Sequence, residues 1–401
     1  MNKITANEKK MFTINSLFTL SNALSSVFVN VFLYVYTESL IVMTLYTCLK
    51  ILMYPPLFTL SGKVATKKNF GLTLSIGLII MMAQLIFILY FNELFGQYHF
   101  LVYVSAIVVG IGESFYWLSI VSLNQYVSQP ETRNRYFGVL GIFNNLSSII
   151  APLLATGLIE AAPNDMAGYT TIFKVVLVLY AIISAISFTV RIHVPSKPFT
   201  VLDKLNLKDK NWEYVFVSTL LFGLRDSLIL TLAGLLVYNA TGGNGSSYSK
   251  LLALFAVIAI TSFAILIRKM NNRNRDKYYL AGCILTASST MVLVLWPTMG
   301  GAIYYGLVNA LASPMFTNPY NVLYMNAISG FKNENLIGRV IGREIAMTIG
   351  RCSGMLFIVL VYMIFGEPCY LPISVTLLSL APVFQYLYHK KTFSKLNIHE
   401  G

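Results

Sequence analysis

Seven ionisable residues stand inside long apolar runs of this 401-residue chain, where a charged side chain is costly. They are Lys50, Glu113, Arg225, Asp226, Arg343, Glu344 and Arg351. An ionised side chain at the centre of a bilayer costs about 2.5–3.5 kcal/mol on insertion scales, so we expect each to face protein or water. Burial disfavours the charged form of a carboxyl group, so a carboxyl in such a run is suited to take up and release a proton. Glu113 is therefore the first candidate for a proton-coupling residue, with Asp226 and Glu344 as reserves.

The basic residues of these runs offer partners for the carboxyl groups. A permanent structural pair with Lys50 is the alternative to proton coupling by Glu113. Arg225 and Asp226 are neighbours whose side chains point about 100° apart on a helix, so we expect them to have different partners. One of them could meet Glu113 or an anionic group on a substrate, while the other braces an adjacent helix.

Three further charged residues fall in the eleventh apolar run. Glu344 and Arg351 are seven residues apart and share one helix face, whereas Arg343 points elsewhere. We expect them to form a gate or a brace between helices more than a contact with substrate.

Uncharged polar residues extend the set of candidates for a substrate cavity. Together with Arg225, the candidates are Asn15, Asn22, Tyr116, Asn309, Asn318, Tyr320 and Asn321. Such groups suit a polar or amphipathic solute. The alternative is that the asparagines bond between helices, at about 0.6 kcal/mol each, and that the tyrosines belong to interfacial belts.

Twelve apolar runs must position these residues, and each is long enough to cross a hydrocarbon core of roughly 30 Å as a helix. They are Lys10–Tyr36, Ser39–Leu60, Phe70–Phe91, Phe100–Leu123, Tyr136–Ile159, Tyr169–Val190, Tyr214–Tyr238, Leu251–Ile267, Tyr278–Trp296, Gly300–Ile328, Leu336–Phe365 and Tyr370–Tyr388. Hydrophobic residues make up 56% of the chain and charged residues 11%, so the water-facing surface of a soluble domain is missing. We predict an all-α membrane protein with twelve transmembrane helices, the first of which is retained and not cleaved as a signal peptide.

The basic residues fix an expected orientation. Of the 29 lysines and arginines, only Lys174 and Lys250 fall at the edges of one set of alternate loops, and four fall within the runs. The remaining 23 lie in the other loops and the tails, so the positive-inside rule places both termini in the cytoplasm. The net charge of +13 is dispersed over short loops, which favours anionic lipid headgroups over nucleic acid as its counter-charge.

Enzyme and metal chemistry find little support. The four cysteines lie far apart with no histidine near them, which argues against a metal site and a disulfide framework. The four histidines fall at run edges or in tails, and the phosphate-binding sequence of ATP motors is missing. We expect no catalytic residues, no metal and no cofactor.

The polar segment 191–213 divides the chain into residues 1–190 and 214–401, with six runs in each. A shift of 204 residues aligns Arg135-Tyr-Phe-Gly138 with Arg339-Val-Ile-Gly342. We therefore predict two pseudo-symmetric six-helix bundles joined by a cytoplasmic linker, with a solute site between them near the midplane. Pro314 and Pro319 should break or bend the tenth helix, and Pro55-Pro56 should do the same in the second.

Over nearly its whole length the chain resembles the major facilitator superfamily. The six-plus-six topology carries the resemblance, together with Gly62-Lys-Val-Ala-Thr-Lys67-Lys68 between the second and third runs. That segment is similar to the family's loop signature, except that Thr66 replaces the acidic residue of the gating latch. The resemblance implies gating or bracing roles, and our candidates are Lys50, Gly62, Lys67, Arg135, Arg339, Arg343 and Arg351. The fifth run, with Gly138, Gly141, Ala151-Pro152 and Gly157, is similar to a glycine-rich stretch of the family's exporters.

The family resemblance implies a secondary transporter of the cytoplasmic membrane that works by alternating access. We expect a monomer that moves a small polar or amphipathic molecule, is coupled to protons and contacts membrane lipids. Export in the manner of drug–proton antiporters is the leading interpretation. Uptake of a nutrient by symport and flipping of a lipid-linked glycan remain alternatives. A membrane-embedded enzyme acting on lipids and a sensor without transport activity belong to other classes.

Overall fold

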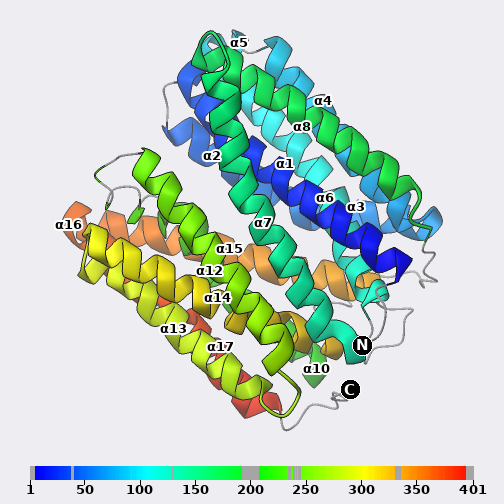
Figure 1. Ribbon diagram of the computed structural model, residues 1–401, viewed down its shortest axis with the longest axis vertical. Coiled ribbons are helices and arrows are strands. Elements are labelled where there is room, and N and C mark those ends of the chain that lie inside the picture. The colour runs from blue at the N-terminus through cyan, green and yellow to red at the C-terminus, as the bar shows by residue number, and fades with distance from the viewer. Residues whose placement is uncertain are drawn as a thin grey trace. The chain divides into compact units, whose positions relative to one another are not determined.

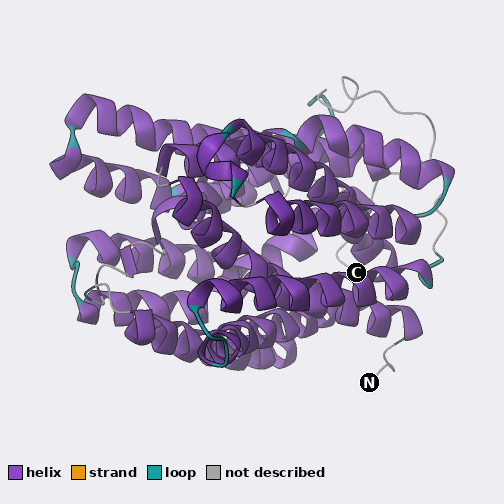
Figure 2. Ribbon diagram, turned by 90° about the horizontal axis from the view of Figure 1, so that it is seen from above, coloured by secondary structure: helices purple, strands orange, loops and turns teal. Residues whose placement is uncertain are grey.

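The computed structural model describes residues 5–37, 40–91, 93–128, 130–191, 207–233, 236–237, 240, 242, 245–329 and 336–393. Every regular element in these ranges is a helix, and none is a strand (Figures 1 and 2). The helical segments of the described ranges correspond one by one to the twelve predicted runs. Most of the central segment 191–213, including residues 192–206, lies outside the description.

The first six runs form α1 (Ala6–Thr37), α2 (Leu40–Leu52) with α3 (Tyr54–Lys67), α4 (Phe70–Phe91), α6 (Phe100–Val127), α7 (Arg133–Glu160) and α8 (Asp165–Phe188). The short α5 (Leu94–Gln97) and the 3-10 turn η1 (Pro130–Thr132) lie in their connections. The second run is interrupted at Met53, two residues before Pro55-Pro56. Proline has no amide hydrogen and crowds the preceding turn, so the predicted break is present and has its physical cause there.

The last six runs form α10 (Lys210–Leu228) with the π-helical turn η2 (Ile229–Ala233), α12 (Gly245–Lys269), α13 (Arg275–Leu295), α14 (Met299–Ser329), α15 (Leu336–Phe365), and α16 (Glu367–Ser379) with α17 (Ala381–Phe393). The side chain of Asp209 caps α10 by accepting bonds from the amides of Asn211 and Trp212.

Of the break or bend predicted for the tenth helix, the break is absent, because α14 continues through Pro314 and Pro319. Helix α13 packs closely on it, and a Cβ atom at Gly282 would lie 2.6 Å from the backbone of Met315 and Phe316. Proline is tolerated within membrane helices where neighbouring helices hold the chain in place.

The chain forms two compact units that do not follow the central segment alone. Unit 1 comprises Met1–Ser128, Ser147–Val201 and Asn333–Glu344, and unit 2 comprises Gln129–Leu146, Leu202–Lys332 and Ile345–Gly401. Helices α7 and α15 therefore each contribute to both units. The core of unit 2 includes an aliphatic cluster of Leu228, Leu232, Ala233, Ile358, Val375 and Leu378.

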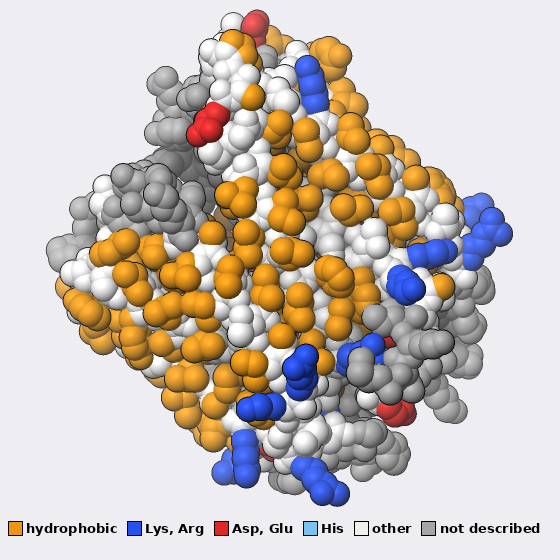
Figure 3. All heavy atoms as spheres, in the orientation of Figure 1, with side chains coloured by type: hydrophobic (Ala, Val, Ile, Leu, Met, Phe, Trp, Pro, Cys, Tyr) orange, Lys and Arg blue, Asp and Glu red, His pale blue; other side chains and the backbone are white. Residues whose placement is uncertain are grey.

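The surface carries many large apolar side chains, including Leu153, Val178, Leu356 and Ile364, as expected where lipid replaces water. In Figure 3 hydrophobic side chains spread over the middle of the visible face, and most of the Lys and Arg side chains in view lie near its lower and right edges. Eight helical stretches of the described residues are long and apolar enough to cross a membrane. The predicted runs outside this group are α1, α2 with α3, α10 with η2, and α14. These less apolar or interrupted helices contain most of the candidate site residues.

Candidate functional site

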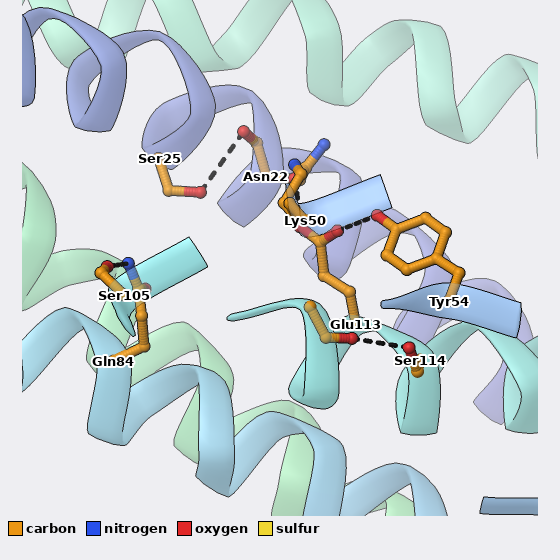
Figure 4. Close-up of polar contacts among 9 residues, drawn as sticks. Asn22, Ser25, Lys50, Tyr54, Gln84, Ser105, Glu113 and Ser114 are labelled. Carbon is orange, nitrogen blue, oxygen red and sulfur yellow. Dashed lines mark hydrogen bonds and ion pairs between the residues drawn. The ribbon is translucent and has the colours of Figure 1, made fainter. Parts of the chain in front are cut away.

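The carboxylate of Glu113, on α6, is the centre of a buried polar cluster in unit 1. Only 6% of the residue is exposed. The Tyr54 hydroxyl donates a hydrogen bond to Oε2, and the Lys50 Nζ lies 3.4 Å from Oε1 (Figure 4). The two oxygens of one carboxylate therefore hold side chains from both sides of the α2–α3 break.

Small residues on α6 allow this approach. A Cβ atom at Gly110, one turn before Glu113, would lie 3.0 Å from the Lys50 carbonyl oxygen and 2.9 Å from the Met53 Cβ. A Cβ atom at Gly112 would likewise be 2.8 Å from the Gly77 carbonyl oxygen on α4. The Gly110-Ile-Gly112-Glu113 sequence thus brings two helices close to the carboxylate and leaves room for Lys50 and Tyr54 beside it.

Further hydroxyl and amide groups lie about two turns before Glu113 on α6 and on the helices beside it. The Gln84 side chain donates to Ser105 Oγ over 2.9 Å (Figure 4). The Tyr46 hydroxyl interacts with Ser105, and the Tyr180 hydroxyl interacts with Ser25. Both tyrosine hydroxyls interact electrostatically with Glu113. The carboxylate therefore lies in a polar environment inside an otherwise apolar bundle.

Aromatic side chains adjoin this cluster. Tyr116, predicted to line a substrate cavity, is fully enclosed and stacks on Phe18 with ring centroids 3.5 Å apart. Trp117 meets both rings edge-on. Asn22, another predicted cavity residue, is partly exposed, and its backbone carbonyl accepts a 3.4 Å bond from Ser25 (Figure 4).

Unit 2 contains a second acid–base pair, between α10 and α15. Arg351 Nε donates to Asp226 Oδ2 over 2.8 Å, the short distance of a charge-assisted bond. Gly223 and Gly350 bring the two helices together next to this pair, and a Cβ atom at Gly223 would lie 2.7 Å from the Met347 carbonyl oxygen. The close backbone contact fixes the distance between the two charged side chains.

Arg225 has different neighbours from Asp226. Its guanidinium carbon lies 5.4 Å from the centroid of the Phe316 ring on α14, an arrangement worth roughly 2 kcal/mol when desolvated. Phe222 stacks against both Phe316 and Tyr320, and the Tyr320 hydroxyl is 3.0 Å from Thr219 Oγ1. The predicted cavity residues Arg225 and Tyr320 thus meet at one aromatic cluster.

The predicted asparagines occupy several environments. The Asn15 amide donates to the Met11 carbonyl and reaches Asn124 on α6 over 3.5 Å. The Asn318 amide donates to the Asn134 carbonyl over 3.4 Å. Asn321 is half-buried, and the buried Oδ1 of Asn309 has no hydrogen-bond partner among the described residues. Asn15 and Asn318 therefore link helices within their units.

The predicted gating residues do not form a single cluster. Arg343 Nη1 lies 4.0 Å from Glu344, whereas Arg351, seven residues later, bonds to Asp226. Gly62 is buried, Lys67 is exposed, and Arg135 and Arg339 are half-buried. Of the seven, Lys50 is the one that contacts Glu113.

Sequence reasoning missed two features of these sites. Tyr54 carries no charge, but its position one turn after Lys50 and directly before Pro55-Pro56 could have indicated it. His389 was placed at a run edge without a role, yet it is fully buried in unit 2 between Tyr214 and Asp276. Its Nδ1 is 2.8 Å from the tyrosine hydroxyl, and its Nε2 is 3.1 Å from the aspartate. No spacing in the sequence links these three residues, which come from α17, α10 and α13.

Metal chemistry gains no support from the described part of the chain, where no three His, Cys, Asp or Glu side chains could hold an ion together. The cysteines Cys48, Cys283, Cys352 and Cys369 are free thiols.

Comparison with known proteins identifies relatives of this architecture. Residues 11–357 match the family model described as Major Facilitator Superfamily. The chain is 26% identical over 389 residues to "Uncharacterized protein YqgE" of Bacillus subtilis (strain 168), covering 95% of this chain and 88% of that protein.

Solved structures with this fold include a bacterial homologue of the iron transporter ferroportin in its outward-facing state. That structure has a TM-score of 0.76 and 13% identity, with 97% of this chain and 100% of that chain covered. The E. coli fucose:proton symporter FucP has a TM-score of 0.72 and 13% identity, with 98% and 99% covered. The predicted fold, with twelve transmembrane helices in two six-helix bundles, is confirmed.

Proposed function

The chain belongs to the Major Facilitator Superfamily and is a membrane transporter, and we propose that it couples solute movement to protons through Glu113. In this proposal it exports a small polar or amphipathic molecule across the cytoplasmic membrane by alternating access, in the manner of a drug–proton antiporter. It acts as a monomer with both termini in the cytoplasm. The two proposed six-helix bundles comprise residues 1–190 and 214–401, and residues 191–213 form the cytoplasmic linker between them.

The arrangement around Glu113 is the observation that carries the proposal. The carboxylate is buried, yet its partners are a lysine at 3.4 Å and one tyrosine hydroxyl. A neutral hydroxyl and a loosely placed ammonium stabilise the charged form less than a short bidentate pair with arginine would. Protonation would release Lys50 and add one positive charge to the cluster, so uptake of a proton changes the field that a solute meets.

The proposed direction of transport is supported by the sequence of α7. Its Gly138, Gly141, Pro152 and Gly157 are similar to the glycine-rich fifth helix of the family's exporters. Helix α7 continues through Pro152. Export by exchange with protons is therefore proposed over uptake.

Transport in proteoliposomes tests the proposal. The purified chain is reconstituted, a proton gradient is imposed, and flux is screened with lipophilic cations, organic anions, sugars and amino acids. In Glu113→Gln we expect gradient-driven flux to fall by at least roughly a hundredfold, as for loss of an essential proton-transfer group. Exchange of labelled for unlabelled solute without a gradient should persist.

Asp226→Asn combined with Arg351→Gln is the matched control, because it removes the other pair without leaving one charge alone. We expect this variant to keep its coupling to the proton gradient. Flux with undiminished gradient dependence in Glu113→Gln would refute the assignment of the proton site. Absence of flux for every solute class would refute transport by this chain.

A further inference from the structure

Arg225 is a buried cation with hydrogen-bonding capacity that the protein does not use. Its residue is 8% exposed, and a guanidinium keeps its charge and carries five N–H donors. Among the residues that the structure describes, its contacts are the Phe316 ring and electrostatic interactions with Asp226, Tyr305 and Cys283. No described oxygen accepts a hydrogen bond from it. Asp226 attracts it, but the Asp226 carboxylate accepts the 2.8 Å bond from Arg351.

A buried charge is normally both paired and hydrogen-bonded, because leaving its donors without acceptors costs free energy. The cation–π contact with Phe316 offsets part of this cost, but a ring face accepts none of the in-plane N–H bonds. The donors of Arg225 are therefore suited to an acceptor that arrives from outside the protein. A planar oxyanion fits best, because a guanidinium binds a carboxylate through two parallel N–H···O bonds.

One face of α14 provides surroundings for the rest of such a ligand. Tyr305, Asn309, Phe316 and Tyr320 follow one another at spacings of four, seven and four residues, so their side chains share that face. Tyr305 interacts with Arg225, and the Asn309 Oδ1 is buried without a partner in the described structure. Both contribute polar groups to the face.

The other end of this face is aromatic. Phe222 on α10 stacks on Phe316 at 5.5 Å and on Tyr320 at 4.6 Å between centroids. Phe316 is fully enclosed and Tyr320 is 3% exposed, whereas Phe222 is half-buried, so Phe222 offers the accessible ring surface of this group. Aromatic rings favour stacked or edge-on contacts with other rings, so this end suits a flat apolar body.

We propose that Arg225 and this face of α14 bind an amphipathic organic monoanion, with its carboxylate on the guanidinium and its aromatic or apolar body against the half-buried Phe222. This inference rests on the proposed transport function and narrows its substrate class. The positive charge of Arg225 disfavours amphipathic cations at the same position. Export of a monoanion in exchange for a proton moves charge in the direction favoured by a membrane potential that is negative inside.

Binding of 1-naphthoate to the purified full-length protein in detergent, measured by calorimetry, tests this assignment without requiring flux. The uncharged analogue 1-naphthamide and the lipophilic cation tetraphenylphosphonium are the comparison probes. We expect 1-naphthoate to bind the wild type at least roughly tenfold more tightly than 1-naphthamide, because only the carboxylate accepts two charge-assisted bonds. We expect Arg225→Gln to weaken 1-naphthoate binding roughly tenfold to a hundredfold and to leave 1-naphthamide binding unchanged.

Arg225→Lys keeps the charge without the planar fork, so it should bind 1-naphthoate with intermediate affinity. Arg268→Gln is the matched control, since it removes an equal charge from an exposed position at the end of α12 and should bind like the wild type. The wild-type comparison of naphthoate with naphthamide stands even if Arg225→Gln fails to fold.

Equal binding of naphthoate and naphthamide, preference for tetraphenylphosphonium, or unchanged naphthoate binding in Arg225→Gln would overturn the inference and leave the proposed transport intact. Naphthoate binding that depends on Arg225, in a protein with no flux in proteoliposomes, would support the site and refute the transport function instead.

Discussion

Glu113 in unit 1 and Asp226 in unit 2 are both carboxylates within apolar helices, and each has a basic partner on another helix. Asp226 accepts a 2.8 Å bond from Arg351, whereas Glu113 has Lys50 at 3.4 Å and shares its other oxygen with the Tyr54 hydroxyl. A proton on Asp226 must displace a short bond from a permanently charged guanidinium. A proton on Glu113 competes with a flexible ammonium and a neutral hydroxyl. A guanidinium at 2.8 Å therefore suits a brace, whereas an ammonium at 3.4 Å suits the carboxylate that we propose as the proton carrier.

The backbone also differs between the two carboxylates: it is interrupted near Glu113 and closely packed near Asp226. Glu113 faces the interruption between α2 and α3 at Met53, which is followed after one residue by Pro55 and Pro56, two residues without an amide donor for the helix. Asp226 and Arg351 lie where Gly223 and Gly350 bring two helix backbones into contact. A small change at Met53 can move Lys50 relative to Tyr54, whereas α10 and α15 cannot shift toward each other without a clash. We therefore infer that the Glu113 centre accommodates rearrangement and the Asp226 pair resists it.

The largest expected difference concerns removal of each basic partner. Arg351→Met should lower the free energy of unfolding by about 3 kcal/mol, because it leaves a largely enclosed carboxylate without its counter-charge. Lys50→Met should cost about 1 kcal/mol or less, because the Lys50 ammonium is 3.4 Å from the carboxylate and Glu113, although more enclosed than Asp226, keeps the Tyr54 bond and in our proposal takes up a proton. Denaturant unfolding of the purified variants in one detergent measures both values. Equal losses would remove the distinction between the two pairs.

A smaller effect is expected from filling the contact between α10 and α15. In Gly350→Ala the added methyl group would collide with the Leu220 carbonyl oxygen, and overpacking of this kind costs about 2 kcal/mol. The same change at Gly157 on α7 meets no atom within 4 Å and should be neutral or stabilising by up to about 1 kcal/mol. Thermal unfolding of the two variants measures the difference. If Gly350→Ala is as stable as Gly157→Ala, the close helix contact does not brace the Asp226 pair.

The smallest predicted change is produced by Tyr54→Phe. Loss of the hydroxyl removes a hydrogen bond to the buried Glu113 carboxylate, which should lower the free energy of unfolding by about 1 kcal/mol. Denaturant unfolding of the variant in the same detergent as the wild type measures this loss. An unchanged free energy of unfolding would show that the hydroxyl does not stabilise the carboxylate.

The sequence predicted the twelve helical segments and their fold because lipid imposes length and hydropathy on every span. It also predicted the interruption in the second run, since Pro55-Pro56 acts locally. The continuity of α14 through Pro314 and Pro319 did not follow from local sequence rules, and α13 packs closely on this part of the helix at Gly282. Sequence rules for helix breaks consider only the residues near the proline, and they leave out packing by a neighbouring helix.

The site shows the same division. The cost of charge in lipid was enough to single out Glu113, Asp226 and Arg225, and seven-residue spacing placed Glu344 and Arg351 on one face of a helix. The partner of Arg351 is instead Asp226, 125 residues away in sequence. His389 lay outside the prediction because Tyr214 and Asp276 reach it from other helices. Which side chains pair across helices depends on how the helices pack, and the spacing of residues along one sequence does not reveal that packing.

Infrared difference spectroscopy between acidic and basic pH, on the protein in lipid, tests the central claim most directly because it detects protonated carboxyl groups without a known substrate. We predict that the carboxyl C=O bands that appear on acidification in the wild type include one component that is absent in Glu113→Gln and is retained when Asp226→Asn is combined with Arg351→Gln. A band that survives in Glu113→Gln and disappears in the double variant would contradict the account, because the proton would then reside on the pair that we assign as the brace.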